Sequence, residues 1–349
     1  MVSSISLPLL DGSISLPLPL HAPDGFFSLP VAIAGYLLAA LFIGIAIRQT
    51  NKNLNERIVP MMGVMAAFIF AAQMINFPVA GGTSGHLVGG ALAAIILGPW
   101  AAILVMTAVV GLQALLFQDG GLVVLGVNLL NMSIVSVLAG YGAYWVSRKV
   151  GRSFKFMMVG GFVAAWISVV VSAASTAAML GVSGTTPLTF ALIAMIGVHM
   201  IIGIGEALIT VFALSFIRAA RPALLEAPAK TPAPDSPVPQ AAQATGGMGV
   251  RWWVVGYIIA VAVTLLAPFA SGSPDGLERV AEDAGFIERA QDAPYAIIAD
   301  YVVPGIQNEG VATILAGIIG VTIIYALVAG GVYGLYALYR RRTGRLAHE

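Results

Sequence analysis

The chain has 349 residues, of which 59% are hydrophobic and 9% are charged, and its mean hydropathy is +0.93. Because about 25% of the residues in a soluble domain are charged, this composition excludes a soluble globular protein. The net charge of +1 gives no basis for a nucleic-acid partner, and the lack of cysteine excludes thiolate metal sites and disulfides.

The first 29 residues precede the first long apolar run. Within them, Ser4-Ile-Ser-Leu-Pro-Leu recurs unchanged as Ser13-Ile-Ser-Leu-Pro-Leu. The stretch has no Lys or Arg, so it lacks the positive start of a secretory signal, and its prolines interrupt any helix. We therefore expect residues 1–19 to be a non-native or removed extension.

Nine apolar segments follow, without the alternating pattern of a membrane strand. The third is short because Gly98-Pro99-Trp100 interrupts it, and short segments at membrane depth are tolerated where protein surrounds them. We expect an all-α polytopic membrane protein, with a seven-helix bundle over 20–221 and two further transmembrane helices within 251–349. The candidate spans are residues 30–47, 58–77, 87–97, 100–117, 129–147, 156–180, 188–217, 252–268 and 311–338.

The segments between the spans indicate the orientation. Residues 222–250 are rich in Ala, Pro, Gln and Thr, which predicts a flexible linker, and an acidic loop occupies 271–310. If every predicted span crosses, 15 of the 17 Lys and Arg residues fall on one side of the membrane. The positive-inside rule then predicts an external N-terminus and 271–310 loop, with a cytoplasmic linker and C-terminus.

His21 and His86, two of only four histidines, lie in turn-rich segments on the predicted external face. Imidazole is the commonest metal ligand. If residue 20 carried a free amine, that amine, the deprotonated His21 amide and His21 Nδ1 would form two fused chelate rings. His86 would complete four nitrogen donors in a plane, an arrangement that suits Ni(II) or Cu(II). The alternatives are a solvated interfacial His21 and an incidental His86 in a capping loop.

Several other polar residues lie in or beside apolar spans. Ser84 is expected to cap the short helix that begins near His86. The amides Gln73, Asn76 and Asn128 are predicted, with Ser84, to support the histidines, although interhelical hydrogen bonding is the favoured alternative for Gln73.

His199 and Glu206 are seven residues apart and therefore share a helical face. We interpret them as a structural or coupling-related pair, with a metal site as the alternative.

The motifs of common enzymes are missing from the sequence. It contains no His-Glu-x-x-His zinc motif, no Gly-x-Ser-x-Gly elbow and no Walker motif. We therefore expect no enzyme activity and no ATP site in this chain, so active transport would need a separate ATPase.

The residues around both histidines resemble a known family. His21-Ala-Pro-Asp-Gly-Phe-Phe-Ser is similar to the N-terminal Met-His-Ile-Pro-Asp-Gly-Phe of the substrate-binding membrane subunits of cobalt/nickel energy-coupling-factor transporters, the CbiM/NikM family. The resemblance covers about residues 20–220. Its other motifs lie in Val64–Gly90, Gly98-Pro-Trp, Gln118-Asp-Gly-Gly, Asn128-Leu-Leu-Asn-Met and Gly203-Ile-Gly-Glu-Ala-Leu-Ile-Thr.

This resemblance implies seven membrane helices and a square-planar nitrogen site for Ni(II) or Co(II) as the transported substrate. Its donors correspond here to the residue-20 amine, His21 and His86. The implied partners are an ATP-binding cassette ATPase and a transmembrane coupling subunit in the plasma membrane of a bacterium or archaeon. Ser273-Pro-Asp-Gly-Leu-Glu resembles the PDGLE element of the nickel-type partner subunit, NikN, which implies a fusion of two subunits and favours nickel.

One position departs from the family. The family ligand is a free amine, whereas Leu20 is internal in this sequence. We expect the mature chain to begin at Leu20, where the family has its initiator Met, either through a leucine start codon or through proteolysis.

Two other functions stay open at this stage. An intramembrane metalloenzyme using His86, His199 and Glu206 predicts bound zinc and turnover. A vitamin-binding transport component predicts a protein without metal, in which His21→Ala leaves uptake unchanged.

Overall fold

The structure, a computed structural model, describes residues 21–52, 58–151, 153–222, 225 and 251–346. The predicted extension 1–19, Leu20 and most of the predicted linker 222–250 lie outside these residues. The basic residues Arg57, Arg152 and Lys230 lie outside them as well. All nine predicted apolar segments fall within the described part, and each of them contains a helix.

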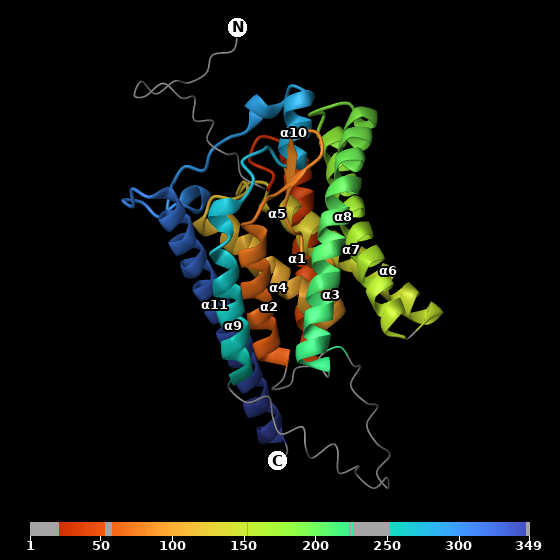
Figure 1. Ribbon diagram of the computed structural model, residues 1–349, viewed down its shortest axis with the longest axis vertical. Helices are drawn as coiled ribbons and strands as arrows, with labels where there is room; N and C mark the ends of the chain where they lie inside the picture. Colours follow the sequence, from red (N-terminus) through yellow and green to blue (C-terminus); the bar gives the residue numbers. More distant parts are fainter. Residues whose placement is uncertain (1–20, 53–57, 152, 223–224, 226–250, 347–349) are drawn as a thin grey trace.

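Residues 21–220 form a bundle of helices with one small hairpin (Figure 1). Apolar segments become helices in a membrane because a helix satisfies its own backbone hydrogen bonds. A π-helical stretch, η1 (Leu129–Val135), joins α5 to α6 without a break. The other elements are α1 (Leu29–Lys52), α2 (Ile58–Gln73), β1 (Phe77–Val79), β2 (Thr83–Gly85), α3 (Gly90–Leu97), α4 (Pro99–Leu116), α5 (Leu125–Asn128), α6 (Ser136–Val150), α7 (Phe154–Val182) and α8 (Leu188–Ala220).

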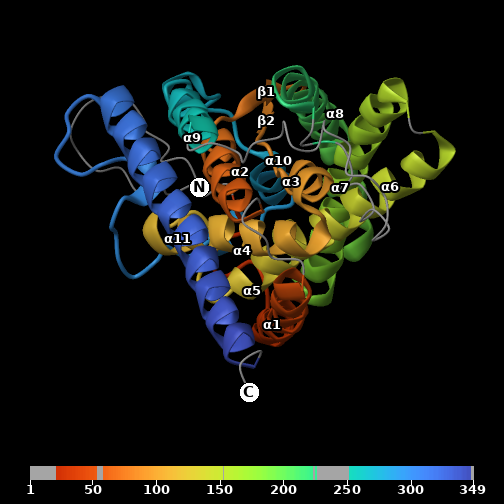
Figure 2. The same ribbon diagram turned by 90° about the horizontal axis from the view of Figure 1, so that it is seen from below.

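The C-terminal part of the chain adds two long helices and a folded loop. Helices α9 (Arg251–Thr264) and α11 (Glu309–Leu346) lie side by side along one flank, and both pack against α2 (Figures 1 and 2). The loop between them contains α10 (Gly276–Asp283), which lies over one end of the bundle (Figure 1). Three 3-10 turns complete this loop: η4 (Ala267–Phe269), η5 (Ile287–Arg289) and η6 (Ala299–Tyr301).

The helices confirm an all-α polytopic membrane protein. Seven described helices are long and apolar enough to cross a membrane, five from residues 21–220 and two from the C-terminal part. Helix α2, with 16 residues, ends before the predicted boundary at residue 77 because Phe77–Val79 pairs antiparallel with Thr83–Gly85. Helix α3 has eight residues and rises only about 12 Å, so it cannot cross about 30 Å of hydrocarbon.

Close packing joins the C-terminal helices to the bundle. At Gly320 on α11, an added Cβ would lie 2.1 Å from Cζ of Phe70 on α2. Phe70 in turn packs against Phe117, with ring centroids 5.2 Å apart. Both phenylalanines are fully buried. The C-terminal helices therefore share one apolar core with the bundle, and this core continues toward the loop after α4.

Candidate metal centre

His21 lies in the segment that precedes α1, and it is 2% exposed. Its backbone N–H donates to Oδ1 of Asp119 at 3.0 Å, and its Nδ1 lies 3.2 Å from the Asp119 carbonyl oxygen. Asp119 belongs to the loop that follows α4. The two His21 nitrogens that a chelate would use therefore face the same residue.

His86 follows the β1–β2 hairpin and lies beside His21. The centroids of the two imidazole rings are 5.7 Å apart, with 62° between the ring planes. His21 Nε2 is buried and has no hydrogen-bond partner within the described residues. His86 Nδ1 lies 3.1 Å from the carbonyl oxygen of Leu87. The fold thus brings together two imidazoles from segments that are distant in the sequence.

Two of the predicted supporting amides hold the backbone beside a histidine. Gln73 Nε2 donates to the carbonyl oxygen of Val88 at 2.9 Å, so its bond goes to the loop of His86 rather than to another helix. Asn128 Nδ2 donates to the carbonyl oxygen of Ala22 at 3.0 Å. Each amide therefore fixes the chain within two residues of a histidine.

The other two predicted supporting residues face the C-terminal loop instead. Ser84 Oγ donates to the carbonyl oxygen of Ser273 at 2.7 Å. The prediction that Ser84 caps α3 is wrong: the cap position is Gly89, with φ 82°, and no side chain accepts a hydrogen bond there. Asn76 uses its backbone carbonyl to accept from the N–H of Ser271 at 2.8 Å.

Glu206 holds the backbone of the loop that follows His86. Its carboxylate is fully buried in α8 and accepts from the N–H groups of Val88 at 2.7 Å and Gly89 at 3.0 Å. His199 has a different partner, since its Nδ1 lies 2.8 Å from the Met195 carbonyl oxygen. The expected pair is therefore two separate structural contacts. No group of three or more His, Cys, Asp or Glu side chains in the described ranges could hold a metal ion.

Sequence reasoning missed two residues near the site. Asp119 was part of the Gln118-Asp-Gly-Gly motif, but nothing in the motif assigned it to His21. Tyr301, in the C-terminal loop, donates its hydroxyl hydrogen to Oδ2 of Asp119 at 2.6 Å. No local pattern marks Tyr301, because its contact depends on a residue 182 positions away.

The C-terminal loop also contacts the His21 segment through its backbone. The N–H of Gln291 donates to the carbonyl oxygen of Asp24 at 2.9 Å. Gly25 has φ 91°, and an added Cβ there would lie 1.9 Å from the carbonyl oxygen of Arg289. Only glycine therefore permits this approach.

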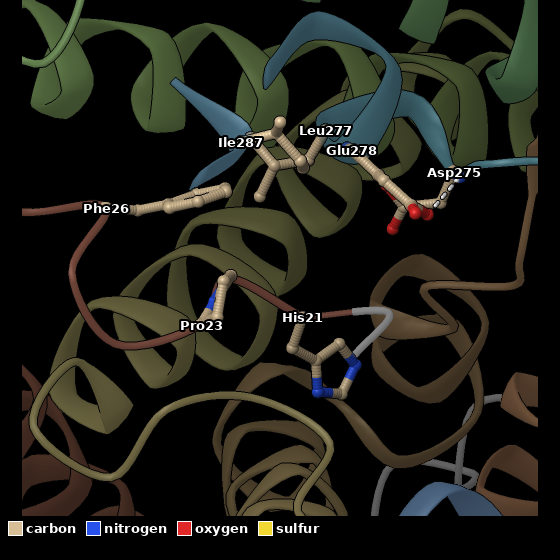
Figure 3. A pocket seen from close by; sticks show the side chains of 7 residues that line it. All are labelled: His21, Pro23, Phe26, Asp275, Leu277, Glu278 and Ile287. Carbon is tan, nitrogen blue, oxygen red and sulfur yellow. Dashed lines mark hydrogen bonds between the residues drawn. The ribbon is translucent and has the colours of Figure 1, made fainter. Parts of the chain in front are cut away.

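A small cavity lies between His21 and α10 (Figure 3). Phe26 and Ile287 are among its apolar walls, and Glu278 of α10 and Asp275, which caps that helix, also line it. These two residues also form a capping box, in which Asp275 Oδ1 accepts from the N–H of Glu278 at 2.7 Å. The carboxyl groups are thus fixed by the start of the helix.

Burial shifts the pKa values of two groups at this site, His21 and Asp275. It lowers the pKa of His21, although Asp119 acts in the opposite direction. A neutral imidazole, the form that binds metal, is therefore favoured. Burial also raises the pKa of Asp275 from 3.8 to about 7.

Two protein families match this chain. Residues 21–224 match CbiM, described as the cobalt uptake substrate-specific transmembrane region. Residues 250–337 match the PDGLE domain. The predicted resemblance to a CbiM/NikM-type subunit followed by a NikN-like PDGLE domain is confirmed.

Individual relatives agree with these matches. A putative metal transport protein of Haloquadratum walsbyi is 43% identical over 213 residues, which cover 59% of this chain and 93% of that protein. A putative fused nickel transport protein NikMN of Archaeoglobus fulgidus is 34% identical over 313 residues, 88% of this chain and 96% of that protein. The crystal structure of a truncated transition metal transporter aligns with a TM-score of 0.52 at 30% identity, covering 57% of this chain and 99% of that chain.

Proposed function

This chain belongs to the CbiM family of substrate-specific transmembrane transport components and carries a fused PDGLE domain; from that premise we propose that it captures Ni(II) or Co(II) on the external face of the membrane. The chain is a transport component rather than an enzyme, as the names of its family and of its fused relatives indicate. The metal ion is its substrate.

The observation that carries this proposal is the arrangement of His21 and His86. His21 directs its amide nitrogen and Nδ1 toward one residue, Asp119, and the His86 ring lies 5.7 Å from the His21 ring. Metal binding displaces the hydrogen of the His21 amide, whereas the neutral imidazole binds through Nδ1 and keeps its hydrogen on Nε2, so binding releases the amide proton and weakens as pH falls. Three nitrogen donors of a square plane then come from His21 and His86.

The fourth donor in this proposal is the amine of Leu20. It becomes available only in a chain that begins at Leu20, so residues 1–19 must be absent from the metal-binding form. N-terminal sequencing of purified, metal-loaded protein tests this point. Recovery of the intact 1–19 peptide from nickel-loaded protein would contradict it.

Nickel is the proposed preference over cobalt. The PDGLE element Ser273–Glu278 belongs to the nickel-type partner, and two fused relatives carry nickel in their names, from Archaeoglobus fulgidus and Rhodobacter capsulatus. Planar nitrogen coordination also suits Ni(II). Competition between the two ions for the purified protein tests the preference.

We assign the release of the metal ion into the cytoplasm to other subunits of the transporter. We propose an energy-coupling-factor arrangement, in which a separate ATP-binding cassette ATPase and a transmembrane coupling subunit drive transport. The orientation is an external His21 segment and a cytoplasmic C-terminus. Co-purification of the tagged chain with its ATPase, and ATP-dependent nickel uptake into vesicles, test this assembly.

The direct experiment measures nickel bound to the purified full-length protein. We expect His21→Ala and His86→Ala each to lose stoichiometric Ni(II). His199→Ala is the matched control, because His199 is a nearby histidine whose Nδ1 contacts Met195, and it is expected to retain the metal. Retention of nickel by both His21→Ala and His86→Ala would refute the site.

A further inference from the structure

The geometry points to Tyr301 of the fused C-terminal domain as a positioning residue for the metal site, acting on His21 through Asp119. This inference rests on the proposed function, because His21 must be a metal ligand for its position to matter. It adds a specific contact by which the fused domain sets the geometry of the binding domain.

Asp119 links the two domains with its two carboxylate oxygens. Oδ1 accepts the His21 backbone N–H at 3.0 Å, and Oδ2 accepts the Tyr301 hydroxyl hydrogen at 2.6 Å. Asp119 is 3% exposed, and the side chains of His21 and Tyr301 are also buried. A buried carboxylate takes its orientation from its hydrogen-bond donors. In the metal-free protein, Tyr301 therefore determines where Oδ1 lies and, through it, the position of the His21 amide nitrogen, which the metal ion then binds in place of this hydrogen bond.

Tyr301 is itself held in a fixed position. Its ring stacks on Phe117, with centroids 4.7 Å apart and 17° between the planes. The N–H groups of Ile298 and Asp300 donate to the carbonyl oxygens of Leu116 and Phe117, both at 3.1 Å. These bonds fasten the loop to the end of α4, the helix that leads into Asp119.

The backbone at this point adopts an uncommon conformation. Asp300 and Tyr301 have φ values of 52° and 58°, in the left-handed region that costs a residue with a Cβ atom. The surrounding contacts compensate this cost, and in this backbone conformation the Tyr301 hydroxyl points toward Asp119. Burial and the Asp119 carboxylate raise the pKa of Tyr301, which keeps the hydroxyl protonated as a donor.

The chain offers a matched pair of tyrosines for the test. Tyr301→Phe removes the hydroxyl group and retains the ring that stacks on Phe117. Tyr295→Phe removes a hydroxyl group from the same loop, one that donates to the carbonyl oxygen of Leu115 at 3.0 Å. The Tyr295 bond fastens the loop to α4 without a contact to Asp119 or His21.

Nickel(II) is titrated into purified full-length protein and each variant, and the ligand-field absorption band of the bound ion is recorded. Loss of an outer partner of a metal ligand typically weakens affinity about 10–100-fold. Because Tyr301 contacts the partner of the ligand rather than the ligand itself, we expect Tyr301→Phe to weaken nickel binding by about tenfold, the lower end of this range, and to shift the absorption band. Tyr295→Phe is expected to leave both unchanged.

Asp119→Asn tests whether the effect passes through Asp119. In that background, the added Tyr301→Phe substitution is expected to cause no further loss, whereas independent effects would add. Unchanged affinity and spectrum in Tyr301→Phe, while His21→Ala loses nickel, would overturn the inference and leave the proposed function intact. Retention of nickel by His21→Ala would overturn both.

Discussion

Glu206 on α8 accepts a hydrogen bond from the N–H of Val88 at 2.7 Å, two residues after His86. A second bond, from the N–H of Gly89, uses the other carboxylate oxygen at 3.0 Å. A buried carboxylate on a membrane helix thus holds the loop of one candidate ligand by its backbone. This relationship explains why an acidic residue is present in an otherwise apolar span.

Replacement of Glu206 is expected to destabilise the protein and weaken metal binding. Glu206→Ala removes the acceptor of two N–H groups, one on the buried Gly89 and one on the half-buried Val88, and the free energy of unfolding should fall by about 3 kcal/mol. Denaturation in mixed micelles and nickel titration measure the two effects. Glu282→Ala, at an exposed carboxylate on α10, is the control. Equal stability of the two variants would contradict the prediction.

Gly25→Ala is expected to separate the C-terminal loop from the His21 segment. The added Cβ meets the Arg289 carbonyl oxygen at 1.9 Å and the residue must keep φ at 91°. We expect the free energy of unfolding to fall by about 1–3 kcal/mol and amide hydrogen exchange at residues 286–291 to become faster. Gly272→Ala should change neither quantity, because nothing lies within 4 Å of an added Cβ there. Unaltered exchange in Gly25→Ala would count against the contact.

The raised pKa of Asp275 predicts that the free energy of unfolding depends on pH. Its pKa is about 7 in the folded protein and 3.8 as the ordinary value, so the folded state holds an extra proton between these values. The stabilisation is therefore present below about pH 4 and is lost as the pH rises through about 7, with a slope of at most about 1.4 kcal/mol per pH unit. Unfolding measured across this range should show the decline.

The test of this assignment uses Asp275→Asn, which keeps a residue that caps helices well but does not titrate. We expect it to flatten the decline in stability, while Glu282→Gln retains the decline of the original protein. A persistent slope in Asp275→Asn would assign the titration to another group.

Ser84→Ala is expected to loosen the loop over the site. The substitution removes the hydroxyl that donates to the carbonyl oxygen of Ser273. The free energy of unfolding should fall by about 1 kcal/mol, and amide hydrogen exchange at residues 271–276 should become faster. Ser147→Ala is the control, because Ser147 Oγ donates within its own helix, to the carbonyl oxygen of Tyr144 at 2.7 Å. If both variants exchange at the same rate as the original protein in this segment, the bond to Ser273 has no role in holding the loop.

The membrane class, the approximate positions of the apolar helices and the two histidines of interest were all predictable from the amino-acid sequence. These features are local: hydrophobic runs predict helices because helical hydrogen bonds join near neighbours. The two histidines were identifiable because imidazole is rare in this chain and has specific metal chemistry. The prediction that Ser84 caps α3 was wrong because the cap position is the left-handed Gly89, five residues later, and α3 begins at Gly90.

The surroundings of the two histidines, in contrast, depend on contacts between residues that are distant in the sequence. Asp119 is hydrogen-bonded to His21, which is 98 positions away in the sequence, and Tyr301 is hydrogen-bonded to Asp119, which is 182 positions away. Such bonds depend on how helices and loops pack, and no periodicity in the sequence encodes that packing. For the same reason, the sequence placed His199 and Glu206 on one helical face, but only the packed structure gave them separate partners, Met195 and the backbone after His86.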